Sequence, residues 1–193
     1  MGRLEDFFKR SIDLGVAAAV LVISLPLWPV IAAAIKIDSR GPVFYLQKRA
    51  GKGNKFFTLI KFRSMVEGAE DGVPLWAAEN DDRITRVGRV LRNLHLDELP
   101  QLLHVLKGEM SLVGPRPERP EFVEVLRKEI PSFDERHKVK PGITGWAQVN
   151  HPYAATIEDS AKKLEYDLYY VKNRSLFFDL KILFLTAKRL VRI

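Results

Sequence analysis

The residues from Leu14 to Ile35 form a run of 22 residues that contains no charged side chain. A helix of that length reaches about 33 Å, which is enough to cross the hydrocarbon core of a bilayer. Pro26 and Pro29 lie inside the run, and Ser24 precedes them. Because proline lacks a backbone donor and clashes with the preceding turn, we expect a helix break at Ser24 and Pro26, with the Ser24 hydroxyl as a partner for a freed carbonyl.

Basic residues flank the uncharged run on both sides. Since basic flanks favour the cytoplasmic side of a membrane, this pattern favours a broken, re-entrant helix whose two ends lie on the same face. Prolines are also common in ordinary membrane helices, so a spanning helix stays equally open on these features. A signal peptide fits less well, because no small-residue cleavage site follows the run. The flanking basic residues are Arg3, Lys9 and Arg10 before the run, and Lys36, Arg40, Lys48, Arg49 and Lys52 after it.

The formal net charge of +7 is unevenly distributed along the chain. Residues 36–63 carry eight basic and one acidic side chain, and residues 136–193 carry eleven basic and five acidic ones, whereas the segment between them is acidic. Such basic segments favour anionic partners, namely membrane lipids or phosphorylated substrates. No zinc-finger or RNP motif is present, so we expect no nucleic-acid partner. The absence of cysteine excludes disulfides, thiolate metal sites and a cysteine nucleophile.

The rest of the chain mixes short strands with helices. Val43–Gln47 and Lys55–Phe62 predict a small β-hairpin around a basic, glycine-rich loop. Arg83–Leu94 predicts a helix with three arginines at spacing three, which we expect to form a solvated face. Ser175–Ile193 combines apolar residues with lysine and arginine. That pattern suits an amphipathic helix in a membrane interface as well as a helix packed on the protein's own core.

Two further segments carry candidate chemistry. Asp97–Gly108 predicts a helix, with Pro100 in its first turn and Gly108 at its end. Its first residues, Asp97 and Glu98, complement the helix dipole or act as a reactive pair of carboxylates. Arg116 lies between two prolines that restrain its backbone. A planar, permanently charged side chain in that position suits a phosphate clamp, with a structural salt bridge as the alternative.

Three longer motifs resemble those of the bacterial sugar transferases, the monotopic phosphoglycosyl transferases that begin glycoconjugate assembly. They are Leu94–Leu102, Met110–Pro117 and Lys140–Val149, and they follow one another in the family's order. Lys61–Met65 and Leu164–Tyr170 support the resemblance. Because the resemblance covers nearly the whole chain, it is more specific than any single short motif.

The resemblance implies an α+β fold that is mostly helical. We expect a re-entrant N-terminal membrane helix, interfacial amphipathic helices, a small β-hairpin and a compact cytoplasmic catalytic body. Residues 1–36 would form the membrane helix, and residues 37–193 would form the catalytic domain, which ends in an interfacial helix. The implied location is the cytoplasmic face of the bacterial inner membrane, in one leaflet. The oligomeric state stays open, with a homodimer among the alternatives.

The implied reaction transfers a sugar 1-phosphate from a UDP-sugar to polyprenyl (undecaprenyl) phosphate and releases UMP. Asp97 is the expected nucleophile, which would form a glycosyl-phospho-aspartate. Glu98 is expected to bind Mg²⁺ together with Asp97 or to orient Asp97. Further residues that the resemblance places at the site are Arg116, Lys61 and Arg63 for substrate phosphate, and Asp167 and Gln148 as neighbours.

Two other functions stay open on the residues alone. The same carboxylates would serve a Mg²⁺-dependent hydrolase of nucleotide sugars or diphosphates, in which water is the acceptor. The basic segments would also suit a non-enzymatic scaffold bound to the membrane interface.

Overall fold

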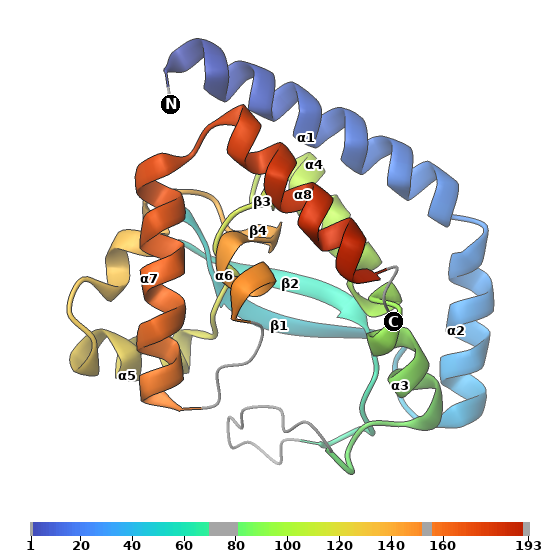
Figure 1. Cartoon of the computed structure of the whole chain (residues 1–193). Coiled ribbons are helices and arrows are strands. Elements are labelled where there is room, and N and C mark those ends of the chain that lie inside the picture. Colours follow the sequence, from blue (N-terminus) through green and yellow to red (C-terminus); the bar gives the residue numbers. More distant parts are fainter. Residues whose placement is uncertain (1, 70–80, 152–155, 191–193) are drawn as a thin grey trace.

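A computed structural model describes residues 2–69, 81–151 and 156–190, which form a mostly helical α+β structure. Two helices, α1 (Arg3–Ser24) and α2 (Leu27–Asp38), form a bent arm along the outside of the molecule (Figure 1). The hairpin lies in the middle, with α7 (Ile157–Asn173) at one end and α2 beyond the other. The remaining helices are α3 (Arg86–Asn93), α4 (Leu102–Lys107), α5 (Pro120–Glu129), α6 (Trp146–Asn150), α8 (Leu176–Leu190), and the 3-10 helices η1 (Lys52–Asn54), η2 (Leu96–Gln101) and η3 (Phe133–Lys138).

The predicted hairpin is confirmed. Its antiparallel strands are β1 (Phe44–Ala50) and β2 (Phe56–Phe62), and the register places Phe44 opposite Phe62. Gly53 in the connecting η1 turn has a φ of 65°, a conformation that glycine adopts without steric cost.

A second, parallel pair of strands was not predicted. It joins β3 (Ser111–Val113) to β4 (Gly142–Thr144). The backbones approach so closely that a Cβ on Gly142 would lie 2.1 Å from the amide nitrogen of Gly114. A three-residue strand is too short to show a recognisable alternation of apolar and polar residues. The pairing also depends on residues that are far apart in the chain.

The predicted helix break is present between Ser24 and Leu27, where α1 and α2 meet at a bend of 62°. No single helix within the described ranges is long and apolar enough to cross a bilayer, whereas this bent pair passes the same test of length and composition together. The Ser24 hydroxyl donates to the carbonyl of Leu21 at 3.1 Å and accepts from Trp28 Nε1 at 3.3 Å. Pro26 has no N–H, so the carbonyl that loses its helical donor is that of Val22. The Ser24 hydroxyl bonds the neighbouring carbonyl of Leu21 and not the freed one.

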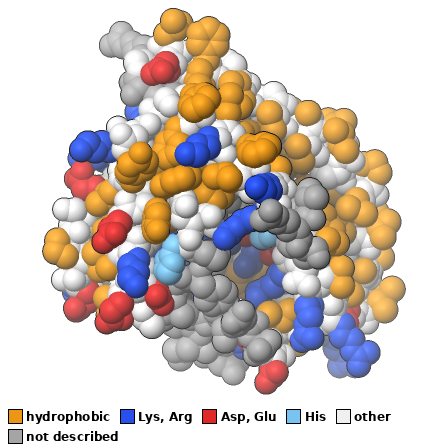
Figure 2. Space-filling view, in the orientation of Figure 1, with side chains coloured by type: hydrophobic (Ala, Val, Ile, Leu, Met, Phe, Trp, Pro, Cys, Tyr) orange, Lys and Arg blue, Asp and Glu red, His pale blue; other side chains and the backbone are white. Residues whose placement is uncertain are grey.

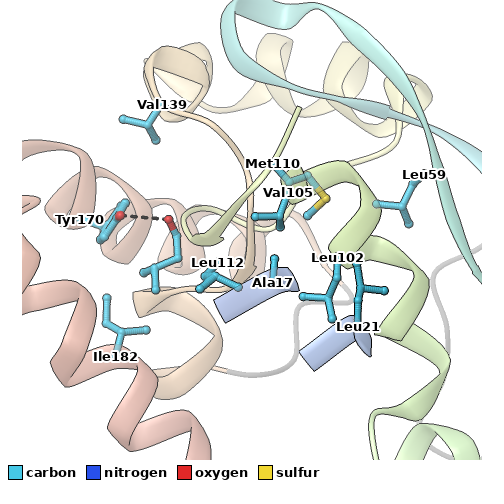
Figure 3. Packing of buried hydrophobic residues seen from close by; sticks show 11 residues of the cluster. Ala17, Leu21, Leu59, Leu102, Val105, Met110, Leu112, Val139, Tyr170 and Ile182 are labelled. Carbon is cyan, nitrogen blue, oxygen red and sulfur yellow. Dashed lines mark hydrogen bonds between the residues drawn. The ribbon is translucent and has the colours of Figure 1, made fainter. Parts of the chain in front are cut away.

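The arm packs on the body through the largest hydrophobic cluster. Ala17 and Leu21 of α1 lie against Leu102 and Val105 of α4 in this cluster (Figure 3). Ala17 and Val105 are both fully buried. The boundary predicted at residue 36 stays a prediction, but α1 contributes directly to the core of the body.

Helix α8 has two apolar faces. Ile182 is fully buried in the main cluster, whereas the side chains of Phe177 and Phe184 are 80% and 69% exposed. The structure therefore combines core packing with an exposed apolar face, as in Figure 2, where hydrophobic side chains gather along α1 and α8. Residues 191–193, which end the segment predicted to be helical, lie outside the described residues.

The helix predicted over Asp97–Gly108 is divided into two parts. The 3-10 helix η2 covers Leu96–Gln101 and contains Pro100, and α4 begins only at Leu102. Proline lacks the N–H that a continuous α-helix needs at this position, which explains the change of helix type. The predicted stop is confirmed, because Gly108 follows α4 with a φ of 86°.

Candidate active site

Asp97 lies at the beginning of η2, immediately after a sharp change of chain direction. His95 has a left-handed backbone conformation with a φ of 54°, and this conformation separates α3 from η2. Pro100 and Gln101 of the same 3-10 turn are also buried. The turn packs on strand β2 and holds Asp97 with only 6% of its surface exposed.

The Asp97 carboxylate is buried but not saturated by hydrogen bonds. No residue that the structure describes donates a hydrogen bond to it. Its pKa is raised to about 6, first by burial and then by the neighbouring charge of Glu98. At neutral pH it is still mainly ionised and needs no base to activate it. Three cations oppose the rise in pKa: Lys61, Arg92 and Arg116.

Glu98 and Arg116 form an ion pair beside Asp97. Arg116 donates from a terminal guanidinium nitrogen to Glu98 Oε1 at 2.6 Å. Burial alone would raise the pKa of Glu98, but the charge and hydrogen bond of Arg116 hold it below its usual value. The pKa of Arg116 is raised, chiefly by the Glu98 charge. The guanidinium is half-exposed, so the pair leaves part of this cation open to a ligand.

Lys61 extends from β2 toward the same carboxylates. Burial, followed by the repulsion of Arg49, lowers the pKa of Lys61 to about 8, while the charge of Asp97 acts in the opposite direction. Its ammonium group lies 5.1 Å from the centre of the Tyr45 ring. The structure therefore brings together Asp97, Glu98, Lys61 and Arg116 of the predicted site residues.

Two further arginines of this cluster were missed by the sequence-based prediction. Arg92 was expected on a solvated face, but it is half-buried, and its Nε donates to Ser64 Oγ at 2.8 Å. Arg49 donates to the carbonyl of Pro117 at 2.9 Å, and burial lowers its pKa to about 10. The arginine spacing in α3 was the available signal for Arg92, whereas nothing in the sequence distinguishes Arg49 from its basic neighbours.

Asp167 lies behind the site rather than in it. Both carboxylate contacts are to Arg136, which donates to Asp167 Oδ2 from Nε at 2.9 Å and from a terminal nitrogen at 2.7 Å. The same terminal nitrogen donates to the backbone carbonyl of Arg116 at 2.9 Å. Arg136 and Asp167 are almost completely buried. Asp167 is thus connected to the site through Arg136 and the backbone of Arg116.

The other two predicted residues make structural contacts elsewhere. Arg63 is buried and donates to the carbonyls of Ser39 and Arg40, which attaches the end of β2 to the segment that follows α2. Gln148 of α6 donates to the carbonyl of Ile143 at 2.9 Å. Neither is brought to Asp97 by a contact that the structure shows.

The donor set at the site fits a magnesium ion that binds mainly through a substrate. The described part of the chain contains no group of three or more acidic or histidine side chains able to hold a metal. Asp97 and Glu98 are adjacent carboxylates, and no described residue donates a hydrogen bond to Asp97. Mg²⁺ typically binds one or two carboxylates, with water and substrate phosphates as its other ligands.

The family model described as bacterial sugar transferase matches residues 4–193 of this chain. A UDP-N-acetylgalactosamine-undecaprenyl-phosphate N-acetylgalactosaminephosphotransferase of Aeromonas hydrophila is 48% identical over 185 residues, which are 96% of this chain and 44% of that protein. The UDP-glucose:undecaprenyl-phosphate glucose-1-phosphate transferase of Escherichia coli is 46% identical over 186 residues, covering 95% of this chain and 40% of that protein. An uncharacterized sugar transferase of Bacillus subtilis, EpsL, is 43% identical, covering 95% of this chain and 87% of its own length. The chain therefore spans less than half of the first two relatives.

Proposed function

This chain belongs to the bacterial sugar transferase family, and on that premise we propose that it transfers a sugar 1-phosphate from a UDP-sugar to undecaprenyl phosphate and releases UMP. The names of two relatives describe transfer of a sugar phosphate to this lipid. The observation that carries the proposal is Asp97, a buried, ionised carboxylate surrounded by the cations Lys61, Arg92 and Arg116. Such a site suits a reaction between anions.

The proposed first step is an attack by a carboxylate oxygen of Asp97 on the phosphorus that bears the sugar. The new bond joins this oxygen to phosphorus, and the bond from phosphorus to the UMP oxygen breaks. UMP leaves with the electron pair, and a glycosyl-phospho-aspartate remains. Covalent catalysis of this kind replaces one difficult displacement with two easier ones.

In the second step, an oxygen of undecaprenyl phosphate attacks the same phosphorus. The bond between phosphorus and Asp97 breaks, which restores the carboxylate and yields the undecaprenyl diphosphate sugar. The acceptor is already an anion, so neither step requires a base. Lys61 and the exposed part of Arg116 offset the negative charge of the transferring phosphoryl group.

Asp97 and Glu98 would hold Mg²⁺ together with the substrate diphosphate. The ion supplies further neutralisation of the phosphate charge. Glu98 is held in place by Arg116 at 2.6 Å, so its carboxylate is fixed beside Asp97 before substrate binds. This fixed geometry reduces the reorganisation that the reaction requires.

The bent arm places this chemistry at a membrane in our proposal. We infer that α1 and α2 enter one leaflet from the cytoplasmic face of the inner membrane and return to it. The exposed apolar residues of α1 and α2, together with the bend of 62°, support a re-entrant arrangement. The exposed apolar face of α8 would lie in the interface and bring the site to the level of the acceptor phosphate.

The proposal is tested with the full chain in detergent micelles. UDP-glucose and UDP-N-acetylgalactosamine are each supplied without acceptor, and intact-mass spectrometry is used to find a glycosyl-phosphate adduct on Asp97. Addition of undecaprenyl phosphate should remove the adduct and accelerate UMP release. We expect Asp97→Asn to form no adduct and to lose roughly 1,000-fold or more in UMP release, because it removes the nucleophile.

Asp82→Asn is the matched control, since Asp82 is an exposed residue outside the site. It should keep the adduct and the rate. If UMP release is indifferent to undecaprenyl phosphate, the protein is a hydrolase. If Asp97→Asn retains the wild-type rate, the covalent mechanism is wrong.

A further inference from the structure

A second polar pocket lies against the first turns of α1, separate from Asp97 and its neighbours. Its volume is about 240 Å³. The side chains around it come from α1, from the η1 turn of the hairpin, from β3, from the segment before β4 and from the end of α7. No residue of the Asp97 cluster lines this pocket, so its occupant does not depend on the proposed transferase chemistry.

Most charged groups around the pocket already have partners. Lys9 donates to Asp179 Oδ2 at 2.5 Å, and Arg10 donates to the carbonyls of Val105 and Leu106 at 2.6 and 3.0 Å.

The two acidic groups of α1 are also engaged. Asp13 Oδ1 accepts from the backbone amide of Leu112 at 3.1 Å, and Asp6 lies 3.7 Å from Arg174. These contacts hold the walls of the pocket together.

Two lysines are left over. Lys52 of η1 and Lys140, which precedes β4, line the pocket and have no ion pair with any residue in the described ranges. The lining contains five basic side chains and two acidic ones. The pocket therefore has a surplus of positive charge even after Asp179 is counted as the partner of Lys9.

The pocket also contains an unpartnered hydroxyl. Ser111 is 1% exposed, and its Oγ has no hydrogen-bond partner among the residues that the structure describes. Buried hydroxyls nearly always find a partner in folded proteins. An acceptor atom inside the pocket would supply the missing one, since Ser111 can donate its proton.

The electrostatic environment of Lys140 agrees with this reading. Burial lowers the pKa of Lys140, and the charges of Arg10, Lys52 and Lys9 lower it further, against the opposing effect of Asp13. An anion in the pocket would relieve this crowding of cations.

We propose that this pocket binds a phosphoryl group, with Lys52 and Lys140 as its cationic partners and the Ser111 hydroxyl as a hydrogen-bond donor. A phosphoryl group offers several acceptor oxygens and suits convergent donors from different segments. The pocket borders residues 6–13, directly before the uncharged run begins at Leu14. With the proposed re-entrant arm, this is the level of lipid headgroups, so the group is supplied by a phospholipid or by a soluble phosphate.

The test measures the acylation of individual lysines in the full chain by mass spectrometry. The protein is held in micelles of a phosphate-free, uncharged detergent, and inorganic phosphate is compared with chloride at equal ionic strength. Phosphate should reduce the acylation of Lys140 at saturation by at least about threefold. Lys162 is the matched control, because it is an exposed lysine of α7 outside the pocket, and its acylation should not change.

Variants assign the protection to the pocket. Ser111→Ala should raise the phosphate concentration needed for half-protection by about fivefold, the effect of one lost hydrogen bond. Lys52→Gln should also raise the phosphate concentration needed for half-protection. It replaces Ser111→Ala in the test if that variant does not fold. Arg116→Met should leave the protection of Lys140 unchanged, because Arg116 belongs to the other site.

A second arm identifies the source of the phosphoryl group. Mixed micelles that contain phosphatidic acid are compared with micelles that contain diacylglycerol, both without free phosphate. Protection by phosphatidic acid supports a lipid headgroup, and protection by inorganic phosphate alone supports a soluble anion. Three results would overturn the proposal and show a water-filled pocket. They are no protection in either arm, equal protection of Lys162, and protection that neither Ser111→Ala nor Lys52→Gln changes.

Discussion

Asp97 and Glu98 are neighbours in the chain, yet the pKa values of their carboxyl groups are shifted in opposite directions. Burial raises the pKa of both groups, but at Glu98 the charge and hydrogen bond of Arg116, together with the charge of Lys61, outweigh it. One carboxylate is thereby engaged and fixed, and the other is left available. This division of labour suits our proposal, in which Glu98 supports the site and Asp97 reacts.

The buried residue His137 gives a prediction about stability and pH. Burial and the adjacent Arg136 lower its pKa to about 4, and Asp134, which lies 3.5 Å from Nδ1, opposes this lowering without cancelling it. As pH falls from about 6.5 to 4, the unfolded chain gains a proton at His137 that the folded chain does not, so stability is lost. Glutamine does not titrate, so we expect the unfolding free energy of His137→Gln to fall less steeply over this pH range, by up to about 1.4 kcal/mol per pH unit.

The measurement is the free energy of unfolding by urea at several pH values between 7 and 4. An unchanged slope in His137→Gln would contradict the burial argument.

The sequence predicted three residues that the structure brings together better than it predicted the residues around them. Asp97, Glu98 and Arg116 were identified because they stand in long motifs. Arg92 and Arg49 were not, since their approach to the site depends on how α3 and β1 pack on η2 and on the Arg116 segment. A basic residue in a sequence gives no indication of whether its charge will be buried.

At the scale of elements, the break between α1 and α2 is the feature that local chemistry determined most directly. Pro26 removes one backbone donor, and the structure bends by 62° at that point. The β3–β4 pair and the division of the Asp97 helix were missed, because both depend on contacts between distant segments or on one residue that changes the helix type.

The bend predicts which side of the membrane each end of the arm faces. The chain has no cysteine, so single cysteines can be placed at Gly2 and Ser39 without a background. In sealed vesicles, we expect an impermeant maleimide to label both positions from the same side, since a re-entrant arm returns to the face that it left. Labelling from opposite sides would show a spanning helix. Pro26→Ala in the same assay reports whether the proline maintains the re-entrant arrangement.

At the scale of the whole molecule, one buried ion pair connects the C-terminal half to the candidate active site. Arg136 of η3 holds Asp167 of α7 and also the backbone of Arg116. Removal of one partner from a buried pair leaves an uncompensated charge, which costs about 3–5 kcal/mol.

Arg136→Met should therefore lower the free energy of unfolding by about 3–5 kcal/mol, as measured by urea denaturation. The double variant Arg136→Met/Asp167→Leu should recover most of this loss, because no unpaired charge remains. Lys138→Met removes an exposed pair with Glu135 and should cost about 1 kcal/mol or less. If the double variant is no more stable than Arg136→Met, the pair does not act through charge compensation.

Arg10 of α1 also stabilises the end of α4. Its guanidinium covers the last carbonyls of α4, the helix that continues directly from the turn carrying Asp97. A truncated protein that lacks α1 would leave those carbonyls without the Arg10 donor. It would also expose Leu102 and Val105, which pack against α1. Helix α1 therefore also supports the helix that follows Asp97, and preparations for biochemistry need to keep it.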